Sequence, residues 1–352
     1  MSQRPTWRFS FAGCSLDSQG RHRANGPCCA LLLLFILTPV LAFAQANGKL
    51  QIHFMDVGQG DGALLISPQG ETVLFDNGAL GVCDRPLKYL RQLRVAKIDY
   101  QVVSHYHADH IGCTTAVLGE FPLLRFSFDR GGQYKSGVYR RYLVAVGDKR
   151  RTPAIGETLV LDQASPHPVT ITFIAMNGNG LRTRNENDLS LVAHVKFGDF
   201  EAAIGGDLSG FSQSSYLDIE TSVAPGIGAV EVYKVHHHCS RYSTNVAWLD
   251  ATRPRVAIIS VGVGNGYGHP TDECLARLHA VGTKTYWTSI GRGAIPAYGV
   301  DVVAQQTVVV EVAANAKGFT VGPASGYRDE YSVLEGLVHA QPTLVTIGNR
   351  RR

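Results

Sequence analysis

The residues with the clearest chemical potential are four metal-binding side chains within six positions, His105, His107, Asp109 and His110. They follow the apolar run 100–103 and precede a segment with a helical pattern. His105 and His107 are two residues apart, so in extended backbone both side chains point the same way and can bind one cation. Asp109 and His110 lie where the helix begins and can face a second cation. Because zinc prefers imidazole and carboxylate ligands in catalytic sites, the spacing predicts a metal centre.

A second histidine cluster supports this interpretation. Seven of the 13 histidines fall in only three places, 105–110, 236–238 and 269. The cluster 236–238 again follows a β-type run, and between the two clusters another run ends at Asp207. Open α/β folds place their ligands where strand ends converge on one edge of a sheet. Asp207 is therefore a candidate to bridge two metal ions.

Mixed strands and helices must position these residues. Apolar patterns predict strands at 50–54, 63–66, 72–75, 100–103, 169–173, 190–197, 200–204, 230–235, 256–260 and 307–312. They predict helices at 86–93, 111–118, 133–148 and 271–280. Gly198-Asp199 predicts a hairpin turn, and Thr271 is expected to cap its helix. We expect one hydrolase domain over 48–315, with helices layered against sheet, and a C-terminal extension over 316–352.

Residues 1–44 are expected to be a removable export signal. Basic residues come first, the apolar run 30–37 follows, and the small residues Ala42 and Ala44 fit cleavage after Ala44. A retained membrane anchor is the alternative, but the run is short for a span and Pro39 interrupts it. The pattern predicts a periplasmic or secreted protein with no membrane span after removal of the leader.

Removal of the leader would lower the net charge of the protein. The whole chain carries a net charge of +4, and the leader holds four arginines and one aspartate, so 4 − 3 leaves about +1 for the mature part. A nearly neutral protein lacks the broad basic field expected of a nucleic-acid binder. Nucleic acid therefore stays a possible partner that the net charge does not support.

Four cysteines remain after the leader, Cys83, Cys113, Cys239 and Cys274. Exported proteins can form disulfides. Cys83 follows one expected active-site loop and Cys113 follows the first histidine cluster, so we expect these two to be bonded. Free buried thiols are the alternative.

Several segments, in this order, resemble the metallo-β-lactamase-fold hydrolases. They are 54–61, 75–78, 104–112, 187–191, 206–207, 234–240 and 267–270. They are most similar to the hydrolase domain of the competence protein ComEC and its stand-alone secreted relatives, over about residues 50–315. The resemblance implies an α/β fold, the four-layer αββα sandwich.

The resemblance also implies a set of ligands for two divalent metal ions, expected to be zinc. His105 and His107 would bind the first ion. Asp109, His110 and His237 would bind the second, and Asp207 would bridge the two. The sequence departs from the family pattern at His236, where the family has proline, and at Cys239, where it has glycine. His236 could therefore shift the register of the ligand at His237 by one residue.

Other positions carry supporting roles by the same resemblance. Asp76 would orient the metal loop, and His238 and His269 would face the substrate or transfer protons together with Asp109. His269 could equally be structural, because it precedes Pro270. The remaining residues expected to support the metals or contact substrate are Asp56, Asn187, Ser190, Lys234 and Ser240.

The expected activity is metal-dependent hydrolysis by an exported protein. A hydroxide bridging two metal ions would attack a phosphodiester in a small molecule or an oligonucleotide. Hydrolysis of a lactone or another ester is one alternative. A non-catalytic, metal-containing binding module in DNA uptake or at the cell wall is another.

Overall fold

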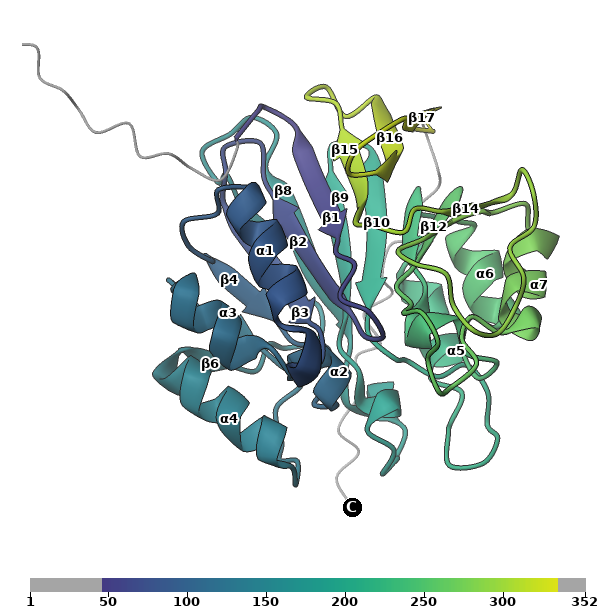
Figure 1. Cartoon of the computed structure of the whole chain (residues 1–352), viewed down its shortest axis with the longest axis horizontal. Helices are drawn as coiled ribbons and strands as arrows, with labels where there is room; N and C mark the ends of the chain where they lie inside the picture. The colour runs from purple at the N-terminus through teal and green to yellow at the C-terminus, as the bar shows by residue number, and fades with distance from the viewer. Residues whose placement is uncertain (1–45, 335–352) are drawn as a thin grey trace, which may run out of the picture. The chain divides into compact units, whose positions relative to one another are not determined.

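The computed structural model describes residues 46–334 (Figure 1). The expected export signal and the end of the expected C-terminal extension lie outside the described residues. Within 46–334 the strands are β1 (Leu50–Phe54), β2 (Gly62–Ile66), β3 (Thr72–Asn77), β4 (Tyr100–Val102), β5 (Ser127–Phe128), β6 (Arg150–Arg151), β7 (Thr158–Leu161), β8 (Val169–Ala175), β9 (Val192–Phe197), β10 (Phe200–Gly205), β11 (Val232–Lys234), β12 (Val256–Ile259), β13 (Lys284–Trp287), β14 (Asp301–Val303), β15 (Val308–Val312), β16 (Gly318–Pro323) and β17 (Asp329–Ser332).

In this part of the chain the strands form two sheets. The first has the order β17-β16-β15-β1-β2-β3-β4-β5-β6, and the second β14-β13-β12-β11-β10-β9-β8-β7. Strands β3 to β6 run parallel in the first sheet, and strands β10 to β14 run parallel in the second. Parallel strands end at one edge of their sheet, so the loops after β4, β10 and β11 can meet.

Helices cover the outer faces of both sheets. The α-helices are α1 (Asp84–Gln92), α2 (Ala108–Ile111), α3 (Thr114–Glu120), α4 (Gly137–Val146), α5 (Glu220–Val223), α6 (Val246–Thr252) and α7 (Asp272–Ala280). Short 3-10 turns are η1 (Leu80–Val82), η2 (Gly147–Lys149), η3 (Asn177–Gly180), η4 (Asn187–Leu189), η5 (Ala224–Gly226) and η6 (His236–Cys239). Figure 1 shows α1, α3 and α4 on one side and α5, α6 and α7 on the other.

Three apolar layers hold this arrangement together. Between the sheets, Phe54 and Val310 share one buried cluster with Phe173 from the second sheet. Leu90 of α1 packs in the outer cluster of the first sheet, and Trp248 of α6 in that of the second. Burial of apolar area on both faces of each sheet is what stabilises a layered α/β fold. The expected αββα sandwich is therefore confirmed.

Several local expectations are confirmed and others need adjustment. Thr271 caps α7 by accepting a hydrogen bond from the Cys274 N–H, and 198–199 joins β9 to β10 as a hairpin. The helix expected over 111–118 is divided into α2 and α3. The helix expected from 133 begins only at Gly137, because the Ser136 hydroxyl accepts the hydrogen bond of the Tyr139 N–H.

Strands β16 and β17 lie beyond residue 315, where we expected the domain to end. They pair with each other, and β16 pairs with β15, so the first sheet continues to Ser332. Residues 318–321 of β16 alternate between half-buried and buried, so one face of this strand is turned to the core. No helix within 46–334 combines the length and apolar character needed to cross a membrane.

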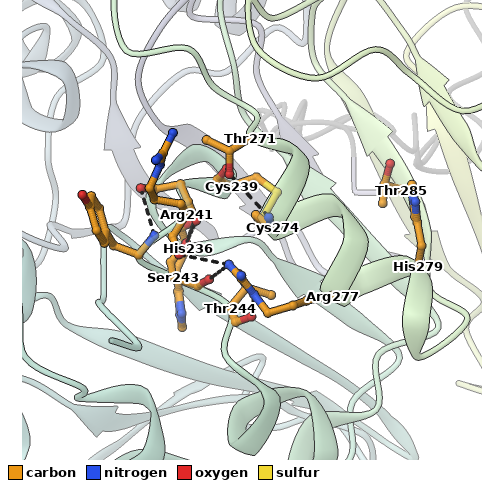
Figure 2. The surroundings of a disulfide bond; sticks show 12 residues. His236, Cys239, Arg241, Ser243, Thr244, Thr271, Cys274, Arg277, His279 and Thr285 are labelled. Atoms are coloured by element: carbon orange, nitrogen blue, oxygen red, sulfur yellow. Dashed lines mark hydrogen bonds between the residues drawn. A yellow bond between two sulfur atoms is a disulfide. The ribbon is translucent and has the colours of Figure 1, made fainter. Parts of the chain in front are cut away.

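Two disulfides lie beside the histidine clusters. The expected Cys83–Cys113 bond is present, with Cα atoms 5.2 Å apart. A second bond, between Cys239 and Cys274, was not anticipated; its Cα atoms are 5.5 Å apart (Figure 2). Cys113 lies three residues after His110 and Cys239 directly follows His238, so each disulfide adjoins one histidine cluster.

Candidate metal centre

Asp207, which follows β10, lies between the two histidine clusters, and its two carboxylate oxygens face different groups of ligands. On one side, Nε2 of His105 lies 3.1 Å from Nδ1 of His107 and 3.9 Å from Oδ2 of Asp207. Nε2 of His237 lies 3.7 Å from the same Oδ2. His105, His107 and Asp207 thus converge in a group that could hold one cation.

A second group surrounds the other carboxylate oxygen. Oδ1 of Asp207 lies 3.3 Å from Nε2 of His110 and 3.5 Å from Nε2 of His238. Oδ2 of Asp109 lies 3.9 Å and 3.6 Å from the same two nitrogens. Zinc bonds of about 2.0–2.1 Å in a tetrahedron separate ligand atoms by roughly 3.4 Å. The four side chains therefore have the spacing of a metal cage.

The second cage differs from the sequence-based expectation in one ligand. His238, rather than His237, faces Asp109 and Oδ1 of Asp207, while His237 faces the Oδ2 side. The local backbone explains this shift. Residues 237, 238 and 239 have φ values of 50°, 54° and 61°, so the chain turns in the left-handed region directly after His236.

The side chain of His236 points away from both groups of candidate ligands. Its Nδ1 lies 2.8 Å from Oε1 of Glu220, and both side chains are fully buried. Glu220 also accepts hydrogen bonds from the N–H groups of Thr244 and Asn245. The pair fixes the start of the left-handed turn and thereby the directions of His237 and His238.

Buried carboxylates orient the outer nitrogens of the ligand rings. Oδ2 of Asp76 lies 2.8 Å from Nδ1 of His110 and accepts a hydrogen bond from the Ser104 hydroxyl. Nδ1 of His238 bonds the Ser260 carbonyl oxygen, and Asp61 lies 3.4 Å from the same nitrogen. Such outer hydrogen bonds fix the ring orientation and tautomer of metal-binding histidines.

Asp61 had no assigned role in the sequence-based prediction. It is buried, forms an ion pair with Lys234, and lies 3.7 Å from Nδ1 of His110 and 3.4 Å from Nδ1 of His238, on the side of these rings that faces away from Asp109. Burial acts to raise the pKa of Asp61, but Lys234 and His238 outweigh it and hold that pKa below its usual range. The aspartate ending the segment 54–61 was the signal that could have revealed it.

The donor set fits positively charged ions. Nε2 of His110, Oδ1 of Asp207 and Nε2 of His238 are buried, and none makes a hydrogen bond to another described residue. Burial acts to lower the pKa of His238, but Asp207 and Asp61 outweigh it and raise that pKa to about 10. The negative charges of Asp207 and Asp61 thus favour a positive charge between the three buried atoms that lack a hydrogen-bond partner.

The other expected residues divide between the centre and its surroundings. Nδ2 of Asn187 lies 3.2 Å from Nε2 of His237, and the Ser190 hydroxyl accepts from the Asp207 N–H. Ser240 and His269 line the cavity over the centre. Asp56 lies apart: it accepts hydrogen bonds from the Gly58 N–H and from Arg85, and so shapes the turn rather than the centre.

A cavity of about 590 Å³ opens above Asp109 and Asp207. Besides the fully buried Tyr106, four tyrosines from separate loops line it, and sequence analysis assigned none of them a role. They are Tyr134, Tyr216, Tyr242 and Tyr267. Burial lowers the pKa of His269, which also lines the cavity, to about 3, so its imidazole is neutral at physiological pH.

A layered αββα fold with histidines and aspartates at converging strand ends defines the metal-binding hydrolase class. The family model of the metallo-beta-lactamase superfamily matches residues 57–263, and the chain belongs to this superfamily. It is 24% identical over 277 residues to ComE operon protein 3 of Bacillus subtilis, covering 72% of this chain and 33% of that protein. It is 27% identical over 262 residues to Recombination protein 2 of Haemophilus influenzae, covering 73% of this chain and 30% of that protein. The chain spans about a third of the length of these curated relatives.

Solved structures show similarity at lower identity. The metallo-beta-lactamase fold protein YhfI from Bacillus subtilis is 14% identical with a TM-score of 0.43, covering 70% of this chain and 99% of that one. A diphosphatase from the PhnP family is 16% identical with a TM-score of 0.40, covering 74% of this chain and 96% of that one.

Proposed function

We propose that this chain is an exported hydrolase that holds two divalent metal ions, zinc in the first instance, and cleaves phosphodiesters. One observation carries the proposal: the two oxygens of Asp207 face two separate groups of ligand atoms. His105, His107 and His237 surround one oxygen, and His110, His238 and Asp109 surround the other.

The metal ions would lower the pKa of a water molecule and polarise the phosphoryl group. The chain's own residues support that chemistry by position. Asp76 and Ser104 orient His110, and Asp61 and Ser260 orient His238, so the ligand rings are held before the ions bind. Neutral His269 and Asn187 line the cavity and can hydrogen-bond substrate oxygens.

Metal stoichiometry tests the assignment of ligands. We expect purified mature protein to contain two metal ions by plasma emission spectroscopy. His107→Ala should lose one ion, His238→Ala should lose the other, and Asp207→Asn should weaken the binding of both. His167→Ala, at an exposed position, is the matched control and should keep both ions. Two ions retained in Asp207→Asn would overturn the shared-carboxylate proposal.

Turnover tests the reaction class. We expect bis(4-nitrophenyl) phosphate to be hydrolysed, the activity to vanish on chelation, and zinc to restore it. Lactone or carboxylic ester cleavage without phosphodiester cleavage would assign the protein to the alternative hydrolase class. A fully metallated protein without turnover on either panel would instead be a binding module.

Export is supported by two independent features. The leader has the pattern of a cleaved signal, and two disulfides lie in the described part of the chain. Disulfides of this kind persist in oxidising compartments. Mass spectrometry of protein from the periplasm or medium should find Gln45 at the N-terminus. Full-length protein in the cytoplasm would contradict the proposal.

A further inference from the structure

The cavity over the metal centre has an aromatic wall, made by Tyr134, Tyr216, Tyr242 and Tyr267. We call these four residues the tyrosine wall. Three of them contact a histidine of the centre: Tyr134 lies 5.9 Å from His107, Tyr216 lies 5.7 Å from His237, and Tyr267 lies 5.8 Å from His269, measured between ring centroids. The wall is therefore adjacent to the position where a bound substrate would react.

Tyr267 presents an aromatic ring whose position is fixed by its neighbours. Its side chain is 72% exposed, and its ring is stacked on His269 with 21° between the ring planes. Oδ1 of the buried Asn265 accepts hydrogen bonds from the N–H groups of Tyr267 and His269. A large aromatic ring exposed on a fixed loop beside a catalytic centre is suited to stack on a flat group of a ligand.

Tyr242 and Tyr216 form a second surface. Their rings stack at 4.8 Å with 26° between the planes, and both line the cavity. Tyr216 in turn contacts His237, so the pair connects the cavity wall to the metal centre. The wall thus presents rings from several loops rather than one isolated tyrosine.

The charges that line the cavity limit what else the substrate can carry. Among the described residues that line it, the ionisable groups other than tyrosine are Asp109, Asp207 and four histidines, without a lysine or arginine. Binding of a polynucleotide depends on lysine and arginine contacts to successive phosphates. The metal ions would neutralise the reacting phosphate, but further phosphates would meet no cationic side chain in this cavity.

We propose that the substrate is a compact phosphodiester with a single reacting phosphate and one planar ring group, such as a nucleobase, that stacks on the tyrosine wall. This inference rests on the proposed phosphodiesterase function and names its substrate class. In the reaction, the oxygen of a water molecule bonds to phosphorus, one P–O ester bond breaks, and the leaving alkoxide takes up the proton that the water loses. The planar group stays on the retained side of the ester and supplies binding energy.

Two substrates with the same leaving group test this inference. They are thymidine 5′-(4-nitrophenyl) phosphate and methyl 4-nitrophenyl phosphate, which differ only in the retained group. Stacking of a base on an aromatic side chain changes affinity roughly 5- to 150-fold. We expect the thymidine ester to have a KM at least about tenfold lower than the methyl ester. Tyr267→Leu and Tyr242→Leu should each reduce that ratio several-fold.

A matched control and a binding measurement complete the test. Tyr327→Leu removes a tyrosine that is 81% exposed in the β16–β17 turn and should leave the KM ratio unchanged. Calorimetric titration should show that the protein binds thymidine 5′-monophosphate more tightly than methyl phosphate. This difference in affinity should shrink in Tyr267→Leu and in Tyr242→Leu. If neither ester is cleaved, the proposed function fails and the binding ratio still decides the inference. Equal affinity for the two phosphates, or a ratio unchanged in both wall variants, would overturn it.

Discussion

Cys239, which directly follows His238, is bonded to Cys274 in the first turn of α7 (Figure 2). The Cys239 carbonyl oxygen also accepts hydrogen bonds from the N–H and the hydroxyl of Thr271. Three successive left-handed residues, 237–239, precede this attachment. The left-handed backbone conformation is energetically unfavourable for residues other than glycine, so contacts with the surrounding structure must stabilise the turn 237–239.

Loss of the Cys239–Cys274 disulfide should loosen the turn 237–239. We expect the double variant Cys239→Ser with Cys274→Ser to lose about 2–4 kcal/mol of unfolding free energy, because the bond closes a loop of 35 residues. It should also release metal to a chelator faster than the parent protein. Urea unfolding of the metal-free protein and a chelator competition assay measure the two effects. An unchanged release rate would show that the disulfide does not hold the ligands.

The buried pair of Glu220 and His236 should matter more than a surface pair. Glu220→Ala leaves His236 and two backbone N–H groups without their acceptor, so we expect a loss of about 3–5 kcal/mol. Glu220→Gln should lose less, since it keeps an acceptor oxygen. Glu273→Ala breaks an exposed pair with Arg241 and should cost below about 1 kcal/mol. Equal effects of the two alanine variants in urea unfolding would contradict this ranking.

Gly206 permits the close approach of the Asp207 loop to Ser104. A Cβ at position 206 would lie 2.3 Å from the Ser104 hydroxyl oxygen and 3.1 Å from Nδ1 of His105. Gly206→Ala should therefore displace Ser104, cost roughly 1–3 kcal/mol and lower metal affinity. Gly119→Ala in α3 meets no atom within 4 Å and should be neutral or slightly stabilising. Metal titration and thermal melting of both variants check this; normal metal affinity in Gly206→Ala would refute it.

Acid should destabilise the fold through His53 in β1. Burial lowers the pKa of His53 to about 4, below the value of about 6.5 expected in the unfolded chain. Stability from this group is complete above pH 6.5, where both states are neutral, and falls as the pH drops from 6.5 to 4, because the unfolded state takes up the proton first. At pH 4 the loss of unfolding free energy should reach about 3 kcal/mol.

His53→Gln should remove this part of the pH dependence. The measurement is urea unfolding of metal-free protein at several pH values, with the exposed His167→Gln as the control. We expect the difference between parent and His53→Gln to change across pH 4–6.5, and the difference between parent and His167→Gln to stay constant. A constant difference for His53→Gln would show that the buried ring does not couple to folding.

Local patterns in the sequence were sufficient for most of the strands and for grouping the candidate metal ligands, whereas the four-layer arrangement was expected from the family resemblance. The alternation of apolar residues predicted the strands that end at His105 and Asp207, and the spacing from His105 to His110 is a property of one short segment. Such features depend on neighbours only a few residues apart, which is why they can be predicted without the tertiary structure.

Only the tertiary structure decided which histidine completes the second cage. Left-handed backbone at 237–239, held by Glu220 and Cys274, turns His238 toward Asp109. Asp61 and His238 are 177 positions apart in the sequence. They lie side by side because Asp61 comes just before β2 of the first sheet and His238 comes after β11 of the second. Contacts across that separation depend on how the sheets pack, and no local pattern of residues encodes that packing.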